Sequence, residues 1–284
     1  LFRGRGRQLF SNGVRLKTAG ELAGILTTVL FCPEDLALIK SGAAERRAFL
    51  DHAICQLRPR YGEALAQYHK LLDHKTRILR DWEKNPSLLE VLEDFNEAMA
   101  RAGALLIHYR AHFVGKLAPR AAQIQRDFSG DREELTLSYQ TVGTVRNPLG
   151  PTVSIYEDLR AHQDSHRRAE LEARSCLSGP HKDDLAAWID GQPARQFASQ
   201  GQTRTAALSL KLAERELFED DTGQWPVLLL DDVLSELDAR RQDFVLDRIT
   251  GGQVFITSCE APAGEISRGK ILHIHQGALV DSPN

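Results

Sequence analysis

Two adjacent carboxylates that follow a short apolar run are the residues of this sequence with the clearest potential for chemistry. The run covers residues 227–230, and Asp231 and Asp232 follow it directly. Four apolar residues between a proline and acids are typical of a strand buried on both faces of a parallel sheet. Open α/β sheets bind ligands at the carboxyl ends of such strands. We therefore expect Asp231 to hold Mg²⁺, which prefers oxygen ligands, and Asp232 to orient an attacking water.

A second polar group precedes this run. Ser199 and Gln202 form a Ser-x-x-Gln capping box, which predicts a helix from Gly201 to about residue 219. The free N–H groups and the positive dipole end of a helix N-terminus favour a phosphate. By itself a capping box predicts only the start of a helix. Its place before the apolar run, the two aspartates and residues 235–238 makes it a candidate phosphate site.

These motifs, in this order, resemble those of ABC-type ATPases. Residues 199–202 resemble the signature motif, residues 227–232 the Walker B strand, and residues 235–238 the D-loop. The sequences of two further stretches are similar to those of the RecF family of bacterial DNA replication and repair proteins. They are Gly179-Pro180-His181-Lys182-Asp183-Asp184-Leu185, and Pro33-Glu34-Asp35 followed by residues 46–51. The resemblance extends over essentially the whole chain.

The resemblance implies an α/β fold, an ABC-type ATPase head with a mixed or parallel sheet and an inserted helical arm. We assign residues 1–43 and 131–284 to the head and residues 44–130 to the arm. Within the arm, apolar residues recur every three or four positions, with a break near Pro59 and a joint at Asn85-Pro86. This periodicity predicts two long helices that pack antiparallel.

For function, the resemblance implies an ATP- and Mg²⁺-dependent DNA-binding protein of recombination, repair and the SOS response. Its ATP site would form between two copies, so that ATP drives formation of a homodimer and is hydrolysed slowly. Implied partners are single-stranded and gapped double-stranded DNA, and mediator proteins of the RecO and RecR type that aid recombinase loading. The implied nucleotide contacts from the second copy are Ser199, Gln200, Gly201 and Gln202, with Ser235 and Asp238 at the interface and Glu34 as a further metal contact.

The sequence contains no Gly-x-x-x-x-Gly-Lys-Ser/Thr phosphate-binding loop. In the RecF family that loop lies upstream of the hairpin predicted at residues 7–16. We therefore expect the chain to be a fragment without its Walker A segment and to be inactive alone. ABC transporters carry a histidine after the next strand, where this chain has Thr257-Ser258-Cys259, which argues against fast hydrolysis.

Basic residues of the arm are candidates for tracking a DNA backbone. Residues 1–130 hold 20 Lys and Arg against 14 Asp and Glu, which leaves 16 against 25 for residues 131–284. A solvated helix face explains the same pattern equally well. The candidates are Arg58, Arg60, Lys70, Lys75, Arg77, Arg80, Arg110, Lys116 and Arg120 in the arm, and His181 and Lys182 after it.

Several other functions stay open. The chain can be the head of another SMC-like or RecN-like ATPase, although an insertion of about 85 residues is short for a long coiled coil. Asp231-Asp232 together with Asp183-Asp184 can serve a metal-dependent nuclease, or the chain can be a binding module only. No apolar run is long enough to span a bilayer and no leader opens the chain, so we expect no membrane partner and a cytoplasmic location.

The remaining periodicity predicts the elements that complete the head. We expect strands at residues 135–139 and 152–155, a helix at 156–174, a hairpin that turns at Asp190-Gly191, a helix at 239–249 capped by Asp238, and a buried strand at 253–258. The tail, residues 271–274 and 278–280, is predicted to close the sheet.

Overall fold

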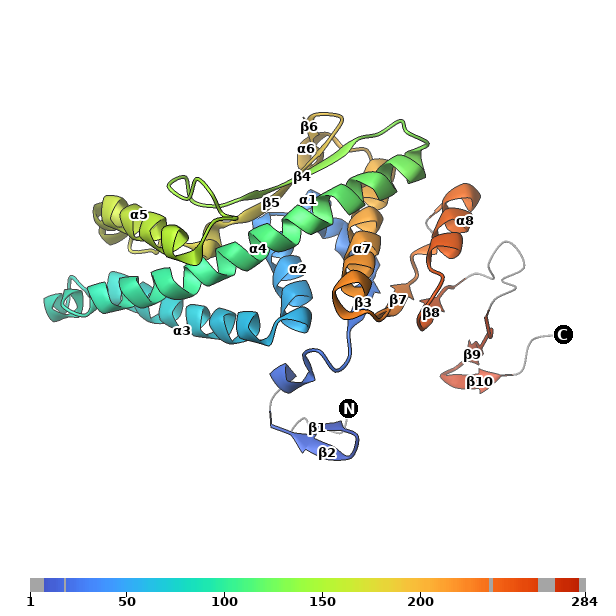
Figure 1. Cartoon of the computed structure of the whole chain (residues 1–284), viewed down its shortest axis with the longest axis horizontal. Helices are drawn as coiled ribbons and strands as arrows, with labels where there is room; N and C mark the ends of the chain where they lie inside the picture. Colours follow the sequence, from blue (N-terminus) through green and yellow to red (C-terminus); the bar gives the residue numbers. More distant parts are fainter. Residues whose placement is uncertain (1–7, 18, 235–236, 260–268, 281–284) are drawn as a thin grey trace.

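A parallel sheet of three strands carries the two aspartates. The computed structural model describes residues 8–17, 19–234, 237–259 and 269–280. Strands β3 (Thr28–Phe31), β7 (Val227–Asp231) and β8 (Val254–Thr257) lie in the order β3-β7-β8. Phe31 pairs with Leu230, and Asp231 pairs with Thr257. The carboxyl ends of all three strands therefore meet at one edge, with β7 in the centre (Figure 1).

The two faces of this sheet differ in burial. Val29, Leu228 and Leu230 are buried in the same core as helix α7 (Gln200–Thr222). On the other face Leu30 and Phe255 are 46% and 52% exposed. The prediction of strands at 227–230 and 253–258 is confirmed. The prediction that residues 227–230 are buried on both faces is wrong, since Val227 and Leu229 are only half-buried. The sequence shows that the residues are apolar, and it does not show whether a second layer covers them.

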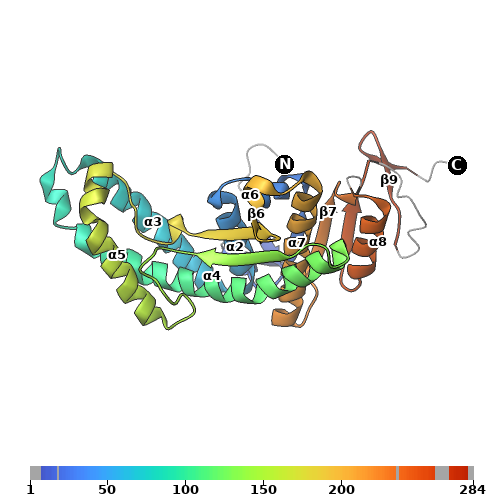
Figure 2. The same cartoon turned by 90° about the horizontal axis from the view of Figure 1, so that it is seen from above.

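Long helices form the other half of the molecule (Figure 1, Figure 2). Helix α4 packs against α3, α5 and α7, so it connects the far end of the helical region to the parallel sheet. Pro59 begins α3 and Pro86 begins the 3-10 turn that joins α3 to α4, which confirms two long antiparallel helices with a break at Pro59. The arm boundaries at residues 44 and 130 stay a prediction. The bounds are α2 (Ala43–Leu57), α3 (Pro59–Asp81), η3 (Pro86–Leu89), α4 (Leu92–Ser129) and α5 (Thr152–Ala173).

An antiparallel sheet lies along α4 (Figure 2). It contains β4 (Leu135–Gln140), β5 (Asp184–Ile189) and β6 (Gln192–Pro193) in the order β4-β5-β6. Asp190 and Gly191 both have positive φ in the turn between β5 and β6, which confirms that hairpin. The predicted strand at 152–155 is wrong, because α5 begins at Thr152 and buries Ile155 and Leu159 on one face.

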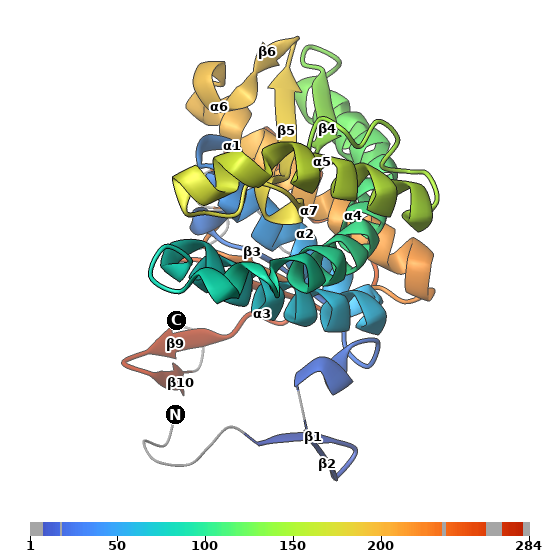
Figure 3. The same cartoon turned by 90° about the vertical axis from the view of Figure 1, so that its left-hand side faces the viewer.

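The ends of the described chain form two separate hairpins. One is β1 (Leu9–Ser11) with β2 (Val14–Leu16), which confirms the first predicted hairpin. The other is β9 (His273–His275) with β10 (Ala278–Val280). Both hairpins project away from the helices (Figure 1, Figure 3). The prediction that the tail closes the sheet is wrong, since β9 and β10 pair only with each other among the described strands.

Short elements link these parts. Asp238 caps α8 as predicted, through a bond from the Arg241 N–H to its side chain. The helix ends at Arg248, close to the predicted position. The linking elements are η1 (Ala19–Leu22), η2 (Pro33–Leu36), α1 (Ala37–Lys40), η4 (Pro180–Lys182), α6 (Ala194–Phe197) and α8 (Ala239–Arg248).

Residues 179–184 connect the helices to the antiparallel sheet. Arg110 of α4 is 2% exposed and donates to the Pro180 carbonyl at 2.8 Å and to Asp183 at 3.1 Å. The same guanidinium donates to Asp51 of α2 and to Tyr61 of α3. Asp183 also accepts a hydrogen bond from Tyr139 of β4. One buried cation therefore holds α2, α3, α4 and residues 180–183 together.

Gly179 makes the close approach of this junction possible. Its φ is +128°, and a Cβ there would clash with the Tyr68 hydroxyl oxygen. Replacing Gly179 by alanine should therefore lower the free energy of unfolding by about 3 kcal/mol, from backbone strain together with overpacking. Denaturant unfolding measures this. The matched control is Gly143→Ala, where a Cβ meets nothing within 4 Å, and equal loss in both variants would contradict the prediction.

Candidate functional site

The two aspartates lie at the carboxyl edge of the parallel sheet. Asp231 ends β7 and is exposed, and Asp232 follows with a positive φ of 52°. The left-handed backbone turns the chain away from the strand direction. As a result Asp232 lines a pocket beside the sheet. Asp231 stays at the edge, next to Thr257 of β8.

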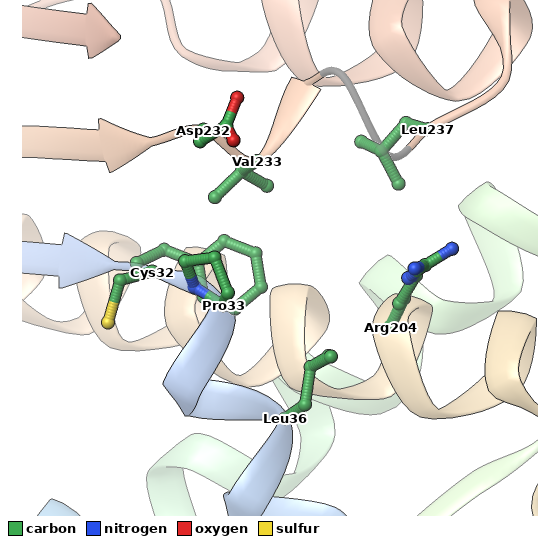
Figure 4. A pocket seen from close by; sticks show the side chains of 8 residues that line it. Cys32, Pro33, Leu36, Arg204, Asp232, Val233 and Leu237 are labelled. Carbon is green, nitrogen blue, oxygen red and sulfur yellow. The ribbon is translucent and has the colours of Figure 1, made fainter. Parts of the chain in front are cut away.

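This pocket lies between the end of β3, the end of β7 and helix α7 (Figure 4). Its walls are mainly apolar, with Asp232 and Arg204 as the charged side chains. Arg204 is a residue that the sequence analysis missed. The available signal was its position on α7, five residues after Ser199 and close to the predicted phosphate site. The lining residues are Phe31, Cys32, Pro33, Leu36, Arg204, Asp232, Val233 and Leu237.

The predicted capping box is present at the start of α7. Ser199 accepts from the Gln202 N–H at 3.2 Å, and Gln202 accepts from the Ser199 N–H at 3.0 Å. The helix begins at Gln200, one residue earlier than predicted. Ser199 and Gln200 are exposed, and Gly201 is half-buried. The N-terminus of α7, with its positive dipole end, is therefore accessible to another molecule.

The start of α8 lies close to the start of α7. Arg241 forms an ion pair with Asp238 at 2.9 Å, and its guanidinium comes within about 4 Å of the position where Gly201 would carry a Cβ. The predicted signature motif (residues 199–202) therefore lies close to Asp238, the described end of the predicted D-loop, within one molecule. Ser235, the other D-loop residue, lies outside the described residues.

Glu34 follows β3 at the same edge but belongs to a different hollow. It lines that hollow with Glu45, His52, Lys211 and Glu214, whereas Asp232 lines the pocket beside α7. Among the described residues, no group of three or more His, Cys, Asp or Glu side chains could hold a metal ion. Mg²⁺ commonly takes one or two carboxylates and completes its shell with phosphate and water. A single exposed carboxylate such as Asp231 fits this mode of binding.

The basic candidates for DNA contact separate into exposed and enclosed residues. Lys75 is fully buried and pairs with Glu170 of α5 at 2.7 Å, so its prediction as a DNA contact is wrong. The prediction of Arg110 as a DNA contact is also wrong, because its guanidinium is buried and hydrogen-bonded to Asp51, Asp183 and the Pro180 carbonyl. Arg58 pairs with Asp221 at 2.6 Å, and Arg120 donates to Asp220. The exposed candidates are Arg60, Lys70, Arg77, Arg80, Lys116 and Lys182.

His181 is held inside the junction by both ring nitrogens. Nδ1 lies 2.7 Å from the Tyr68 hydroxyl, and Nε2 lies 3.1 Å from the Cys176 carbonyl oxygen. Because a carbonyl only accepts, Nε2 donates and Nδ1 accepts from Tyr68. No ring nitrogen is left for a phosphate, so the prediction of His181 as a DNA contact is wrong. Lys182 beside it is exposed.

The structure does not assemble the predicted nuclease site. Asp184 accepts two hydrogen bonds from Arg46, at 2.6 and 2.9 Å. Asp183 is paired with Arg110 and Tyr139. Both residues lie at the start of the antiparallel sheet, while Asp231 lies at the end of the parallel one. The four carboxylates of the nuclease hypothesis are therefore divided between two sites.

Comparisons with known proteins identify the family to which the chain belongs. No family profile matches this chain. The DNA replication and repair protein RecF of Clostridioides difficile (strain 630) is 36% identical over 277 residues, covering 96% of this chain and 73% of that protein. The chain belongs to the RecF family. Other RecF proteins match over 66% of their length, so the chain spans about two thirds of several relatives.

Two solved RecF structures show the same fold. One is that of the recombination mediator protein RecF-ATPrS in the RecFOR pathway, with a TM-score of 0.84, 35% identity, and coverage of 94% of this chain and 71% of that chain. The other is RecF-ATP, with a TM-score of 0.81, 37% identity, and coverage of 89% and 67%. The predicted resemblance to RecF and the predicted α/β ATPase-head fold class are confirmed. No described helix is both long and apolar enough to cross a membrane.

The environment of His181 predicts a pH dependence of stability. Burial lowers the pKa of His181 from 6.5 to about 4. His181 binds a proton near pH 6.5 in the unfolded chain and only near pH 4 in the folded chain. The free energy of unfolding therefore decreases as the pH falls from 6.5 to 4. Between pH 7 and 5, wild type should lose about 2 kcal/mol more than His181→Gln.

Urea unfolding at the two pH values measures this difference. His112→Gln, at an exposed position of α4, serves as the control and should follow wild type. If His181→Gln and wild type lose stability equally, the ring is not buried in its neutral form.

Proposed function

We propose that this chain is the ATPase head and arm of a RecF protein that binds ATP between two copies and grips DNA. Three features support the proposal: family membership, the nucleotides named for the two similar RecF structures, and the geometry of the edge site. The observation that carries it is that Asp231 and the Ser199-capped end of α7 are both exposed. Each offers half of a nucleotide site to a second molecule.

In this mechanism the two halves act from different copies. Asp231 would hold Mg²⁺ through a carboxylate oxygen, and Asp232 would orient the attacking water from the pocket beside α7. The hydroxyl of Ser199 and the N–H groups of Gln200 and Gly201, all from the other copy, would donate to the terminal phosphate. Asp238, Ser235 and Gln202 border the contact between copies. Bound Mg²⁺ would neutralise charge on the phosphates.

The biological role follows from the family. We propose that ATP closes the dimer on single-stranded or gapped double-stranded DNA, and that slow hydrolysis opens it again. Recombination mediators of the RecO and RecR type act with it to aid recombinase loading during repair and the SOS response. Glu34, in η2 after the neighbouring strand β3, is kept as a second candidate metal contact. We also propose that the protein is cytoplasmic.

Dimer formation can be tested by blocking the end of α7. The sequence has no phosphate-binding loop, so the experiment joins this chain to the segment of a RecF relative that supplies one. ATP with Mg²⁺ should then raise the sedimentation coefficient to that of a dimer, and Ser199→Arg should abolish the rise, because a long cation fills the phosphate position. Ser154→Arg, an exposed serine in the first turn of α5, is the control. An ATP-induced dimer in the Ser199→Arg protein would contradict the proposal that the ATP site forms between two copies.

DNA binding by the arm can be tested at its exposed cations. Reversing charge at Lys70 and Arg77 of α3 should weaken binding to a gapped duplex at least tenfold. It should also reduce the slope of log affinity against log salt by about one for each lost phosphate contact. Fluorescence anisotropy over a salt series measures both quantities. Arg195→Glu, exposed on α6, is the control, and an unchanged slope in the double variant would rule out these phosphate contacts.

A further inference from the structure

Thr257 of β8 connects the two aspartates through one hydroxyl. Its Oγ1 lies 2.5 Å from Asp231 Oδ1 and 3.1 Å from the Asp232 amide nitrogen. A carboxylate only accepts and an amide N–H only donates, so the direction of both bonds is determined. The hydroxyl donates to Asp231 and accepts from Asp232. Its proton therefore binds Asp231, and one of its lone pairs accepts the N–H of the next residue, Asp232.

The second bond supports a backbone turn that is otherwise unfavourable. Asp232 has a φ of +52°, in the left-handed region that few non-glycine residues adopt. Its N–H also donates to the Thr257 main-chain oxygen at 3.2 Å. Thr257 therefore binds this turn with both its backbone and its side chain. The turn decides where the two carboxylates go, because it places Asp232 in the pocket and leaves Asp231 at the edge.

The first bond fixes one oxygen of Asp231 and leaves the other open. Within the described part of the chain, Oδ2 of Asp231 has no hydrogen-bond partner, and the residue is exposed. A carboxylate that is held by one oxygen presents the other in a defined direction. Carboxylates that bind metals in proteins are commonly oriented by such neighbouring hydrogen bonds.

We propose that Thr257 is a positioning residue for the Asp231-Asp232 pair. It fixes Asp231 through Oδ1, so that Oδ2 would be available to Mg²⁺, and it keeps Asp232 turned into the pocket. This inference rests on the proposed function for the role of the metal, but the hydrogen bonds themselves can be tested without it. The hydroxyl is the group that matters, so serine should replace Thr257 and the isosteric valine should not.

Hydrogen–deuterium exchange on the chain as it stands tests the turn. In Thr257→Val the Asp232 amide should exchange about tenfold faster than in wild type, which corresponds to the loss of one hydrogen bond of average strength. Thr257→Ser should exchange at the wild-type rate. Thr136→Val, at an exposed position of β4, controls for the same change elsewhere. Equal exchange in Thr257→Val and wild type, or fast exchange in both Thr257 variants, would overturn the proposal.

Paramagnetic broadening by Mn²⁺ tests the metal. In wild type, Mn²⁺ should broaden the amide signals of Asp231 and Asp232, and Thr257→Val should need about tenfold more Mn²⁺ for the same effect. Thr257→Ser should match wild type, and Asp231→Asn should show no broadening. If Asp231→Asn is broadened normally, the metal role in the proposed function is wrong. If Asp231→Asn is not broadened but Thr257→Val matches wild type, the positioning role of Thr257 is wrong.

Discussion

The arrangement of this molecule depends on one buried guanidinium. A charge removed from water is costly unless it is paired and fully hydrogen-bonded. Arg110 meets this condition only because Asp51, Tyr61, Asp183 and the Pro180 carbonyl converge on it from different elements. Separating any one of these elements would leave a buried charge with fewer partners. Breaking such a pair costs about 3–5 kcal/mol, so the helices and the antiparallel sheet behave as one unit.

This constraint explains residues 179–184, where the sequence suggested DNA contacts at His181 and Lys182 and a nuclease carboxylate pair at Asp183 and Asp184. His181 and Asp183 face inward to Tyr68 and Arg110, and Asp184 binds Arg46. Burial raises the pKa of Asp183, and Arg110 and Tyr139 oppose that shift. Polar residues in a row can therefore serve to connect helices. Lys182, the exposed member, is the one that remains free for a surface role.

Local patterns in the sequence predicted local structure well. The capping box at Ser199, the apolar run before Asp231 and the Asp190-Gly191 turn were all confirmed, because each depends on residues a few positions apart. Burial of charge was not predictable in this way. Lys75 is covered by Glu170, 95 positions later, and helical periodicity carries no information on which distant element covers a face. The prediction that the tail closes the sheet failed for the same reason, and Arg204 was missed because its pocket is formed by three separate segments.

Helix α4 has a consequence for how motion could be passed along this molecule. It has 38 residues without interruption, from the far end of the helical region to its contact with α7. At 1.5 Å per residue such a helix is about 57 Å long. A tilt of about 10° where it meets α7 would therefore displace the opposite end by about 10 Å. A small rotation beside the proposed nucleotide site would therefore become a larger displacement in the helical region where α3 carries Lys70 and Arg77.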